Sequence, residues 1–141
     1  VIELHGSSRS LVCTRCGYRI SRSEAGRLDW SPGYPVCPSC GGPMKPDVVF
    51  FGEPLPHDAL KAALELAEMS DLILVAGSSL TVSPANMLPS IVKSNGGRVI
   101  IVNGSETSFD PMADIVIRGR VEVVLPELCR RATGLDNCMP G

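Results

Sequence analysis

The chain has 141 residues, of which 44% are hydrophobic and 20% are charged, and its formal net charge is −2. This composition is typical of a folded domain and lacks the basic excess of nucleic-acid-binding proteins. The longest apolar run, residues 72–76, is far shorter than the roughly 18 residues of a membrane-spanning helix, and no signal peptide is visible. We therefore expect a soluble, cytoplasmic protein without direct contacts to nucleic acid or membrane, and its oligomeric state stays open.

The beginning of the chain differs in composition from the rest. Residues 1–4 have the pattern of the end of a strand, whereas residues 5–46 are rich in Gly, Ser, Pro, Arg and Cys and show almost no apolar periodicity. Such a segment does not supply a conventional hydrophobic core. We therefore predict that residues 5–46 form a small module held together by something other than apolar packing.

Residues 47–132 alternate short apolar runs with amphipathic stretches. The elements predicted in chain order are a helix from residue 56, a strand at 72–76, a helix at 85–93, strands at 99–102 and 115–117, and a helix at 122–132. Apolar runs without alternation are typical of parallel strands covered on both faces. This order predicts an α/β fold, with a partial Rossmann-like parallel sheet and flanking helices formed by residues 1–4 and 47–132, and residues 133–141 as a flexible tail.

Local signals predict the ends of the helix at 85–93. Ser83 suits the N-cap position and Pro84 the first helical position, and the pair Gly96–Gly97 ends the helix. Pro126 weakens the first turns of the last helix.

Four of the six cysteines form two Cys-x-x-Cys pairs, namely Cys13, Cys16, Cys37 and Cys40. Such pairs supply four thiolates for a tetrahedral zinc ion, and Gly17 and Gly41 suit the tight turns that follow them. Two disulfides or a redox dithiol are the alternative interpretations, although an intracellular protein disfavours disulfides. We predict a zinc-ribbon module with one structural Zn²⁺, because four thiolates leave no position open for substrate. Cys129 and Cys138 are expected to be ordinary thiols without a role.

Two polar segments follow predicted strands. Gly77, Ser78 and Ser79 come directly after the strand at 72–76, and Asn103 ends the next strand, with Glu106 three residues later. Glycine permits close approach of a ligand, and polar groups at the carboxyl ends of parallel strands can bind phosphate or ribose oxygens. The segment lacks the Gly-x-Gly-x-x-Gly fingerprint, so an ordinary turn is the alternative.

His5 follows the apolar residues 2–4 and precedes Gly6. A histidine in this place suits general-base catalysis, with an ordinary loop histidine as the alternative. His57, at the start of a helix, is expected to be solvated.

Residues 45–53 combine apolar and aromatic side chains in one short run. One interpretation is a buried strand that includes Val48 and Phe50. The other is a sheet edge that accepts an extended peptide, with Val49 and Phe51 facing it.

Taken together, these segments resemble the catalytic domain of the sirtuins, which are NAD-dependent protein deacylases. The matching blocks occur in the order found in the family, and they are residues 2–6, the two Cys-x-x-Cys pairs, and residues 45–53, 77–80 and 101–107. The resemblance extends from residue 1 to about residue 132. It implies removal of acetyl or a related acyl group from protein lysines, giving nicotinamide and O-acyl-ADP-ribose.

The resemblance also implies a role for each matching position. His5 would be the general base that deprotonates a hydroxyl of the NAD ribose, and the four paired cysteines would bind the structural zinc. The positions implied to line the acyl-lysine tunnel and pair with the peptide are Val49, Phe51 and Gly52. The positions implied to contact NAD are Gly77, Ser78, Ser79, Asn103, Gly104, Ser105, Glu106 and Val121.

Two sirtuin segments are missing from these residues: a Gly-Ala-Gly-x-Ser loop for the pyrophosphate and a Gln-Asn-x-Asp segment for the nicotinamide pocket. We therefore expect the C-terminal part of a sirtuin domain, without turnover as an isolated chain. Two other functions stay open: a non-catalytic zinc-bearing module that binds protein or nucleotide, and a mono-ADP-ribosyltransferase that uses the same site with another acceptor.

Overall fold

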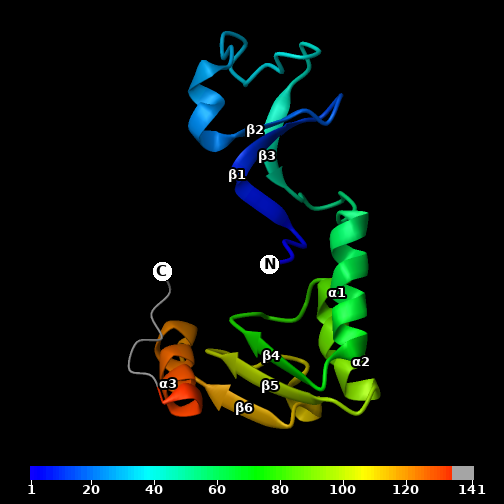
Figure 1. Cartoon of the computed structure of the whole chain (residues 1–141), viewed down its shortest axis with the longest axis vertical. Coiled ribbons are helices and arrows are strands. Elements are labelled where there is room, and N and C mark those ends of the chain that lie inside the picture. Colours follow the sequence, from blue (N-terminus) through cyan, green and yellow to red (C-terminus); the bar gives the residue numbers. More distant parts are fainter. Residues whose placement is uncertain (135–141) are drawn as a thin grey trace. The chain divides into compact units, whose positions relative to one another are not determined.

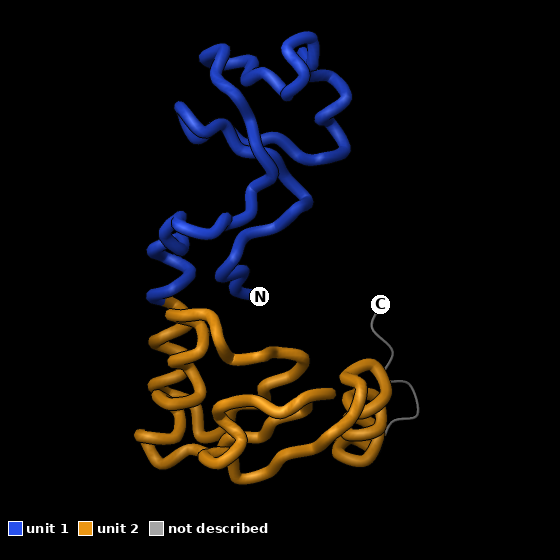
Figure 2. Tube along the Cα trace, turned by 180° about the vertical axis from the view of Figure 1, so that it is seen from behind, with its two compact units in different colours: residues 1–61 blue, residues 62–141 orange. Residues whose placement is uncertain are grey.

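A computed structural model describes residues 1–134 of the chain, which divides into two compact units, residues 1–61 and 62–141 (Figure 2). The first unit contains an antiparallel sheet with the strand order β2-β1-β3, and the second contains a parallel sheet with the order β4-β5-β6. Within the described part of the chain, no helix has the length and apolar character needed to cross a bilayer.

The first unit is built around one long strand. β1 (Gly6–Cys13) pairs on one side with β2 (Arg19–Ser21) and on the other with β3 (Met44–Val48), and the 3-10 helix η1 (Arg22–Arg27) follows β2 (Figure 1). Residues 1–4 are not part of a strand. The prediction that they end a strand is therefore wrong, because no strand among the described residues pairs with them.

The core of the first unit is small and rich in sulfur. Its buried residues are Leu11, Cys13, Ala25, Cys37 and Met44, and Ile20, Leu28 and Cys40 pack against them. Cysteines thus occupy positions that large aliphatic side chains fill in an ordinary core. Residues 5–46 thus contain a small apolar core, which the sequence did not predict, and two of its five buried residues are cysteines.

The elements of the second unit follow the order predicted from the sequence. They are α1 (His57–Met69), which begins in the first unit, β4 (Leu72–Ala76), η2 (Ala85–Met87), α2 (Leu88–Ser94), β5 (Arg98–Asn103), η3 (Asp110–Met112), β6 (Ile115–Arg118) and α3 (Val121–Thr133). The three strands pair in parallel. α2 packs against β4 and β5, and α3 packs against β5 (Figure 1). The fold class is therefore the predicted one, a partial Rossmann-like layer together with a module of the zinc-ribbon type.

Burial differs among the three parallel strands. The side chains of Val99, Ile101 and Val102 on β5 are 0% exposed, whereas Leu72 and Leu74 on β4 are 46% and 45% exposed. The prediction of strands covered on both faces therefore holds for β5 and is wrong for β4. Leu72 and Leu74 share one face of β4, and this face is exposed, whereas Val75 on the opposite face is 8% exposed.

The ends of α2 are only partly as predicted. Residues 85–87 form the separate 3-10 turn η2, and α2 begins at Leu88 with Pro89 in its first turn and no side-chain cap. The prediction that Ser83 caps this helix is therefore wrong. Gly96 has a φ of +84° directly after the helix, which agrees with the predicted glycine stop.

The last helix contains Pro126, as expected, and continues through Thr133. Residues 135–141, the larger part of the predicted tail, lie outside the described residues, as does Cys138. Cys129 on α3 is disulfide-bonded, so the expectation of a plain thiol at this position is wrong.

Candidate functional sites

The four paired cysteines lie on two similar loops of the first unit. In the first loop the Cys13 amide donates to the Tyr18 carbonyl at 2.8 Å, and the Gly17 amide donates to the Cys13 carbonyl at 3.1 Å. In the second loop the Cys37 amide donates to the Gly42 carbonyl at 2.8 Å, and the Gly41 amide donates to the Cys37 carbonyl at 2.9 Å. Gly17 and Gly41 have φ values of +73° and +69°, which explains the glycine after each pair.

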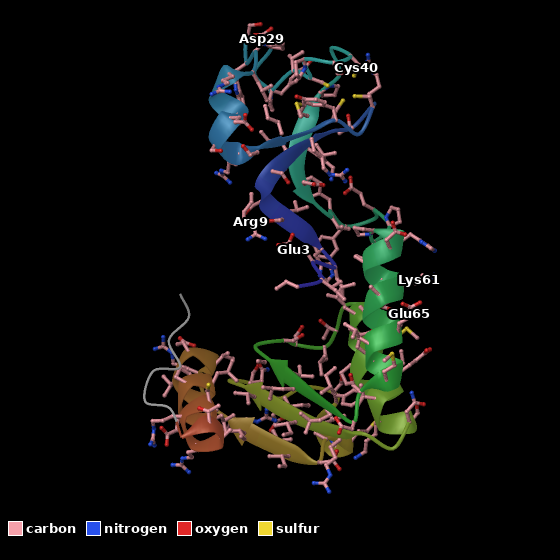
Figure 3. The ribbon with its side chains drawn as sticks, viewed as in Figure 1. Glu3, Arg9, Asp29, Cys40, Lys61 and Glu65 are labelled. Carbon is pink, nitrogen blue, oxygen red and sulfur yellow. The ribbon has the colours of Figure 1, made fainter. Side chains whose placement is uncertain are left out.

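The loops bring the sulfur atoms together. All four Sγ atoms lie within 4.8 Å of one another, and the shorter separations are 3.5 Å for Cys13–Cys40 and 3.7 Å for Cys16–Cys37. Tetrahedral zinc with bonds of about 2.3 Å separates its sulfurs by about 3.8 Å. These four cysteines are free rather than disulfide-bonded. Cys40 is labelled in the first unit in Figure 3. The donor set therefore fits one zinc ion with all four positions filled, which is a structural site.

The first loop also favours the thiolate that zinc binds. The Cys16 amide is the largest influence on the Cys13 thiol, and with the Arg15 amide it lowers the pKa of Cys13 to about 6 against the effect of burial. Amide protons directed at sulfur stabilise its negative charge.

His5 lies in the turn before β1, with an exposed side chain. Its carbonyl accepts a hydrogen bond of 2.9 Å from the Val49 amide, which ties the turn to the end of β3. Gly6 has a φ of +72°, and a Cβ there would lie 2.1 Å from the Asp47 carbonyl oxygen. The backbone after His5 therefore requires glycine, and the imidazole is presented to solvent at the end of two paired strands.

The segment after β3 forms a turn fixed by two side chains. Lys45 Nζ donates to the Val48 carbonyl and to Glu53 Oε2, each at 2.7 Å, and lies 4.5 Å from the centre of the Phe50 ring. Glu53 Oε2 accepts a further hydrogen bond of 3.0 Å from the Phe50 amide. Lys45, and then the Phe50 amide, lower the pKa of the Glu53 carboxyl, so the turn is held by an ionised pair.

The candidate peptide-binding residues are carried by this turn. Phe51 is fully exposed, Val49 is half-buried, and Gly52 has a φ of +89°. Phe50 is 50% exposed, so the interpretation of Phe50 as a buried strand residue is wrong, whereas Val48 is half-buried at the end of β3. The reason is that the chain leaves the sheet at Val48 and turns.

In the second unit, candidate cofactor residues gather at the carboxyl ends of the parallel strands. Gly77 follows β4 with a φ of +62°, and its amide donates to the Val102 carbonyl of β5 at 3.0 Å. A Cβ on Gly77 would lie 3.3 Å from Cγ2 of Val121, the first residue of α3. The structure thus brings together Gly77, Val121 and the end of β5. A side chain at position 77 would narrow the space between residue 77 and Val121.

The two serines after Gly77 make local hydrogen bonds. Ser78 Oγ accepts one of 3.2 Å from the Leu80 amide, and Ser79 Oγ lies 2.8 Å from Thr81 Oγ1. Both hydroxyls therefore have partners within the loop that follows the carboxyl end of β4, a backbone amide for Ser78 and a hydroxyl for Ser79.

Asn103 and the residues after it form the second part of this edge. Asn103 is 7% exposed, and its Nδ2 donates to the Ser105 carbonyl at 3.0 Å. Arg118 Nη1 also donates to the Ser105 carbonyl, at 2.9 Å, and Arg118 forms an ion pair with Asp110. Gly104, Ser105 and Glu106 remain exposed. Arg118 and Asp110 were not found from the sequence, because only the pairing of β5 with β6 places Arg118 beside residue 103.

The sequence of residues 1–84 matches the family model described as the Sir2 family. The chain belongs to the Sir2 family. The NAD-dependent protein deacetylase 1 of Pyrobaculum aerophilum is 52% identical over 136 residues, which cover 96% of this chain and 53% of that protein. The NAD-dependent protein deacetylase of Sulfolobus acidocaldarius is 50% identical over 129 residues, covering 91% of this chain and 50% of that protein.

Solved structures of the Sir2 family agree with this membership. A Sir2 homolog in complex with NAD has a TM-score of 0.88 and 42% identity, and the match covers 95% of this chain and 51% of that one. Sir2Tm bound to a propionylated peptide has a TM-score of 0.83 and 39% identity, and the match covers 95% and 55%. The chain therefore spans about half the length of the relatives it matches.

Proposed function

We propose that these residues are part of an NAD-dependent enzyme that removes acyl groups from protein lysine side chains. The observation that carries the proposal is the match of 96% of the chain to a protein deacetylase at 52% identity. Two structural features support it: the solvent-exposed His5 beside an exposed turn, and a glycine-containing edge at the ends of parallel strands. The cytoplasmic location, and the domain division at residues 5–46 and 47–132, stay predictions.

In this proposal the two units supply different groups. His5 acts as the general base toward a ribose hydroxyl of NAD, which requires an imidazole nitrogen within hydrogen-bond reach of that hydroxyl. Val49, Phe51 and Gly52 bind the acyl-lysine peptide along the exposed turn. The zinc bound by Cys13, Cys16, Cys37 and Cys40 takes no part in the reaction and holds β1 and β3, the strands that carry His5 and the turn.

The second unit would bind the adenosine side of NAD. Gly77, Ser78, Ser79 and Val121 form one side of this proposed contact, and the residues of the second side are Asn103, Gly104, Ser105 and Glu106. Exposed backbone amides and hydroxyls at the ends of parallel strands are suited to phosphate and ribose oxygens. The hydrogen bonds of Asn103 and Arg118 to the Ser105 carbonyl fix the shape of this loop before any ligand binds.

The test is a chimera in which the part of the Pyrobaculum aerophilum deacetylase that this chain does not match is joined to this chain. We expect the chimera to release nicotinamide from NAD and to deacetylate an acetyl-lysine peptide, and we expect both activities to be lost in the His5→Ala variant. The His57→Ala variant is the matched control, because His57 is an exposed histidine on α1.

Two outcomes would contradict the proposal. A folded, zinc-loaded chimera that releases no nicotinamide with any acyl-lysine peptide would favour a non-catalytic binding module. Release of nicotinamide with transfer of ADP-ribose to protein, and without loss of the acyl group, would favour mono-ADP-ribosyl transfer.

A further inference from the structure

A cavity of about 470 Å³ opens in the first unit between β1, β3, η1 and the loop after η1. None of the residues assigned to peptide, NAD or zinc lines it. Its volume lies in the range of small-molecule sites, which are apolar cavities with a few polar groups at defined places.

Three residues of the cavity lining belong to the buried core of the first unit. Leu11, Ala25 and Met44 line the cavity and are 8%, 8% and 4% exposed. The same three residues form the buried core with Cys13 and Cys37. This part of the cavity wall therefore belongs to the same buried core as two of the zinc-binding cysteines.

The outer wall is suited to a flat ring. Trp30 and the proline rings of Pro35 and Pro46 line it, and Trp30 Nε1 donates to the Ala25 carbonyl at 3.0 Å, which holds the indole in place while half of it stays exposed. Aromatic rings pack on indole and proline faces, and the thioether of Met44 adds a favourable sulfur–aromatic contact.

The rim of the cavity carries one positive charge. Arg22 lines the cavity, and its guanidinium has no hydrogen-bond or ion-pair partner among residues 1–134. The Ser8 hydroxyl lines the same cavity and is likewise without a partner in that range, and no acidic side chain contributes to the lining. By contrast, Arg27 at the other end of η1 is paired with Glu24. An unpaired guanidinium beside an apolar cavity is complementary to a carboxylate on an apolar body.

We propose that this cavity binds a small aromatic carboxylate, with the ring against Trp30 and Met44 and the carboxylate on Arg22. The proposal is independent of the enzymatic function, because it uses none of the residues assigned to the reaction. It also differs from docking of an apolar protein side chain in the same cavity, since such a side chain would make no use of the charge on Arg22.

Trp30 is the single tryptophan of the sequence, so its fluorescence reports on this cavity alone. The experiment titrates the zinc-loaded 141-residue chain with 3-phenylpropionate and, in parallel, with neutral 3-phenylpropionamide, at constant pH and ionic strength. The NMR signal of the Trp30 indole N–H is followed as a second measurement. We expect saturable binding of the acid that is at least tenfold tighter than binding of the amide.

Variants of the two arginines on η1 complete the test. Arg22→Gln should remove the preference for the acid, Arg22→Lys should keep part of it, and Arg27→Gln should leave it unchanged, with zinc content confirming that each variant is folded. Equal binding of acid and amide would overturn the proposal in favour of an apolar side chain as the occupant. An unchanged preference in Arg22→Gln, or no response of Trp30 in either measurement, would also overturn it.

Discussion

The two units of this chain are stabilised by different means. In the first unit, cysteines that fit a zinc ion share the core with three small or medium side chains, Leu11, Ala25 and Met44. In the second unit, β5 buries Val99, Ile101 and Val102 completely in an aliphatic core. We therefore expect the first unit to depend on zinc for its folding and the second unit to fold without it.

The two units also carry different parts of the proposed site. The proposed base and peptide-binding turn are carried by the metal-dependent unit, and the proposed adenosine contacts by the metal-independent one. Zinc removal should therefore abolish peptide binding while leaving nucleotide binding intact, although zinc takes no part in the reaction. The following changes are chosen to test this division, from the largest expected effect to the smallest.

Removal of zinc should have the largest effect. Structural zinc sites contribute roughly 10–16 kcal/mol of apparent binding free energy, which becomes folding free energy. A chelator, or the Cys13→Ala variant, should expose the amides of the first unit to hydrogen exchange and leave those of β4, β5 and β6 protected. The control is Ser39→Ala, because Ser39 lies between the second pair of cysteines with an exposed side chain. Unchanged protection of the first unit would contradict the zinc assignment.

Truncation of a core side chain in the second unit should destabilise that unit and leave zinc binding by the first unit intact. Ile101→Ala removes a completely buried side chain of the central strand and should cost about 2–5 kcal/mol in the free energy of unfolding of the second unit. Ile115→Ala is the matched control, because Ile115 on β6 is 51% exposed. For both variants, denaturant unfolding measures the free energy of unfolding, and zinc content reports on the first unit. Loss of zinc in Ile101→Ala would show that the units do not separate as proposed.

Gly6→Ala tests the backbone that carries His5. The new Cβ would meet the Asp47 carbonyl at 2.1 Å, at a φ of +72°, so strain of at least roughly 1–3 kcal/mol is expected, together with weaker pairing of β1 with β3. Gly26→Ala is the control, because no atom lies within 4 Å of a Cβ at that position. The Val49 amide, which donates to His5, should lose protection from exchange in the first variant only.

The smallest effect is expected in the turn at residues 49–53. Lys45 and the Phe50 amide lower the pKa of Glu53 below its ordinary value of 4.5. Because the folded-state pKa is lowered, the stabilisation is present above the ordinary value and is lost as the pH falls through the lowered one. Glu53→Gln should therefore increase exchange of the Phe50 amide at neutral pH.

The exchange rate of the Phe50 amide at acid pH provides the check. The difference between Glu53→Gln and the parent chain should shrink as the pH falls below the ordinary pKa of 4.5 and through the lowered one. Asp58→Asn, which removes a carboxylate from the exposed His57–Asp58 pair, should leave the Phe50 amide unchanged at every pH. If Glu53→Gln and the parent chain still differed in Phe50 exchange at acid pH, the turn would be stabilised by packing rather than by the ion pair.

The sequence was informative where a local pattern determines the structure. Apolar runs predicted β4, β5 and β6, because each run lies within one strand. The two Cys-x-x-Cys pairs predicted one group of four sulfur atoms although Cys16 and Cys37 are 21 residues apart, because a tetrahedral zinc ion needs the ligands of both pairs. The order of the strands in the sheet could not be predicted from local patterns. The contact of Arg118 with the Ser105 carbonyl follows from the pairing of β5 with β6, and the exposure of Leu72 follows from which face of β4 is covered.

Departures from local rules account for other differences. Ser83 has the residue type of a helix cap, but the 3-10 turn η2 separates it from α2. Phe50 has the pattern of a strand residue, but the hydrogen bonds of Glu53 to the Phe50 backbone turn the chain out of the sheet. Both exceptions depend on the residues that follow, Ala85–Met87 for Ser83 and Glu53 for Phe50.

The most direct test of the proposed division titrates the isotope-labelled chain with ADP-ribose, followed by backbone NMR with and without zinc. We expect shifts at residues 77–79, 103–106 and 121 in both forms, and preserved protection of β5 after zinc removal. Shifts confined to residues 1–61, no shifts at all, or loss of the response when zinc is removed would contradict an adenosine site carried by the second unit alone.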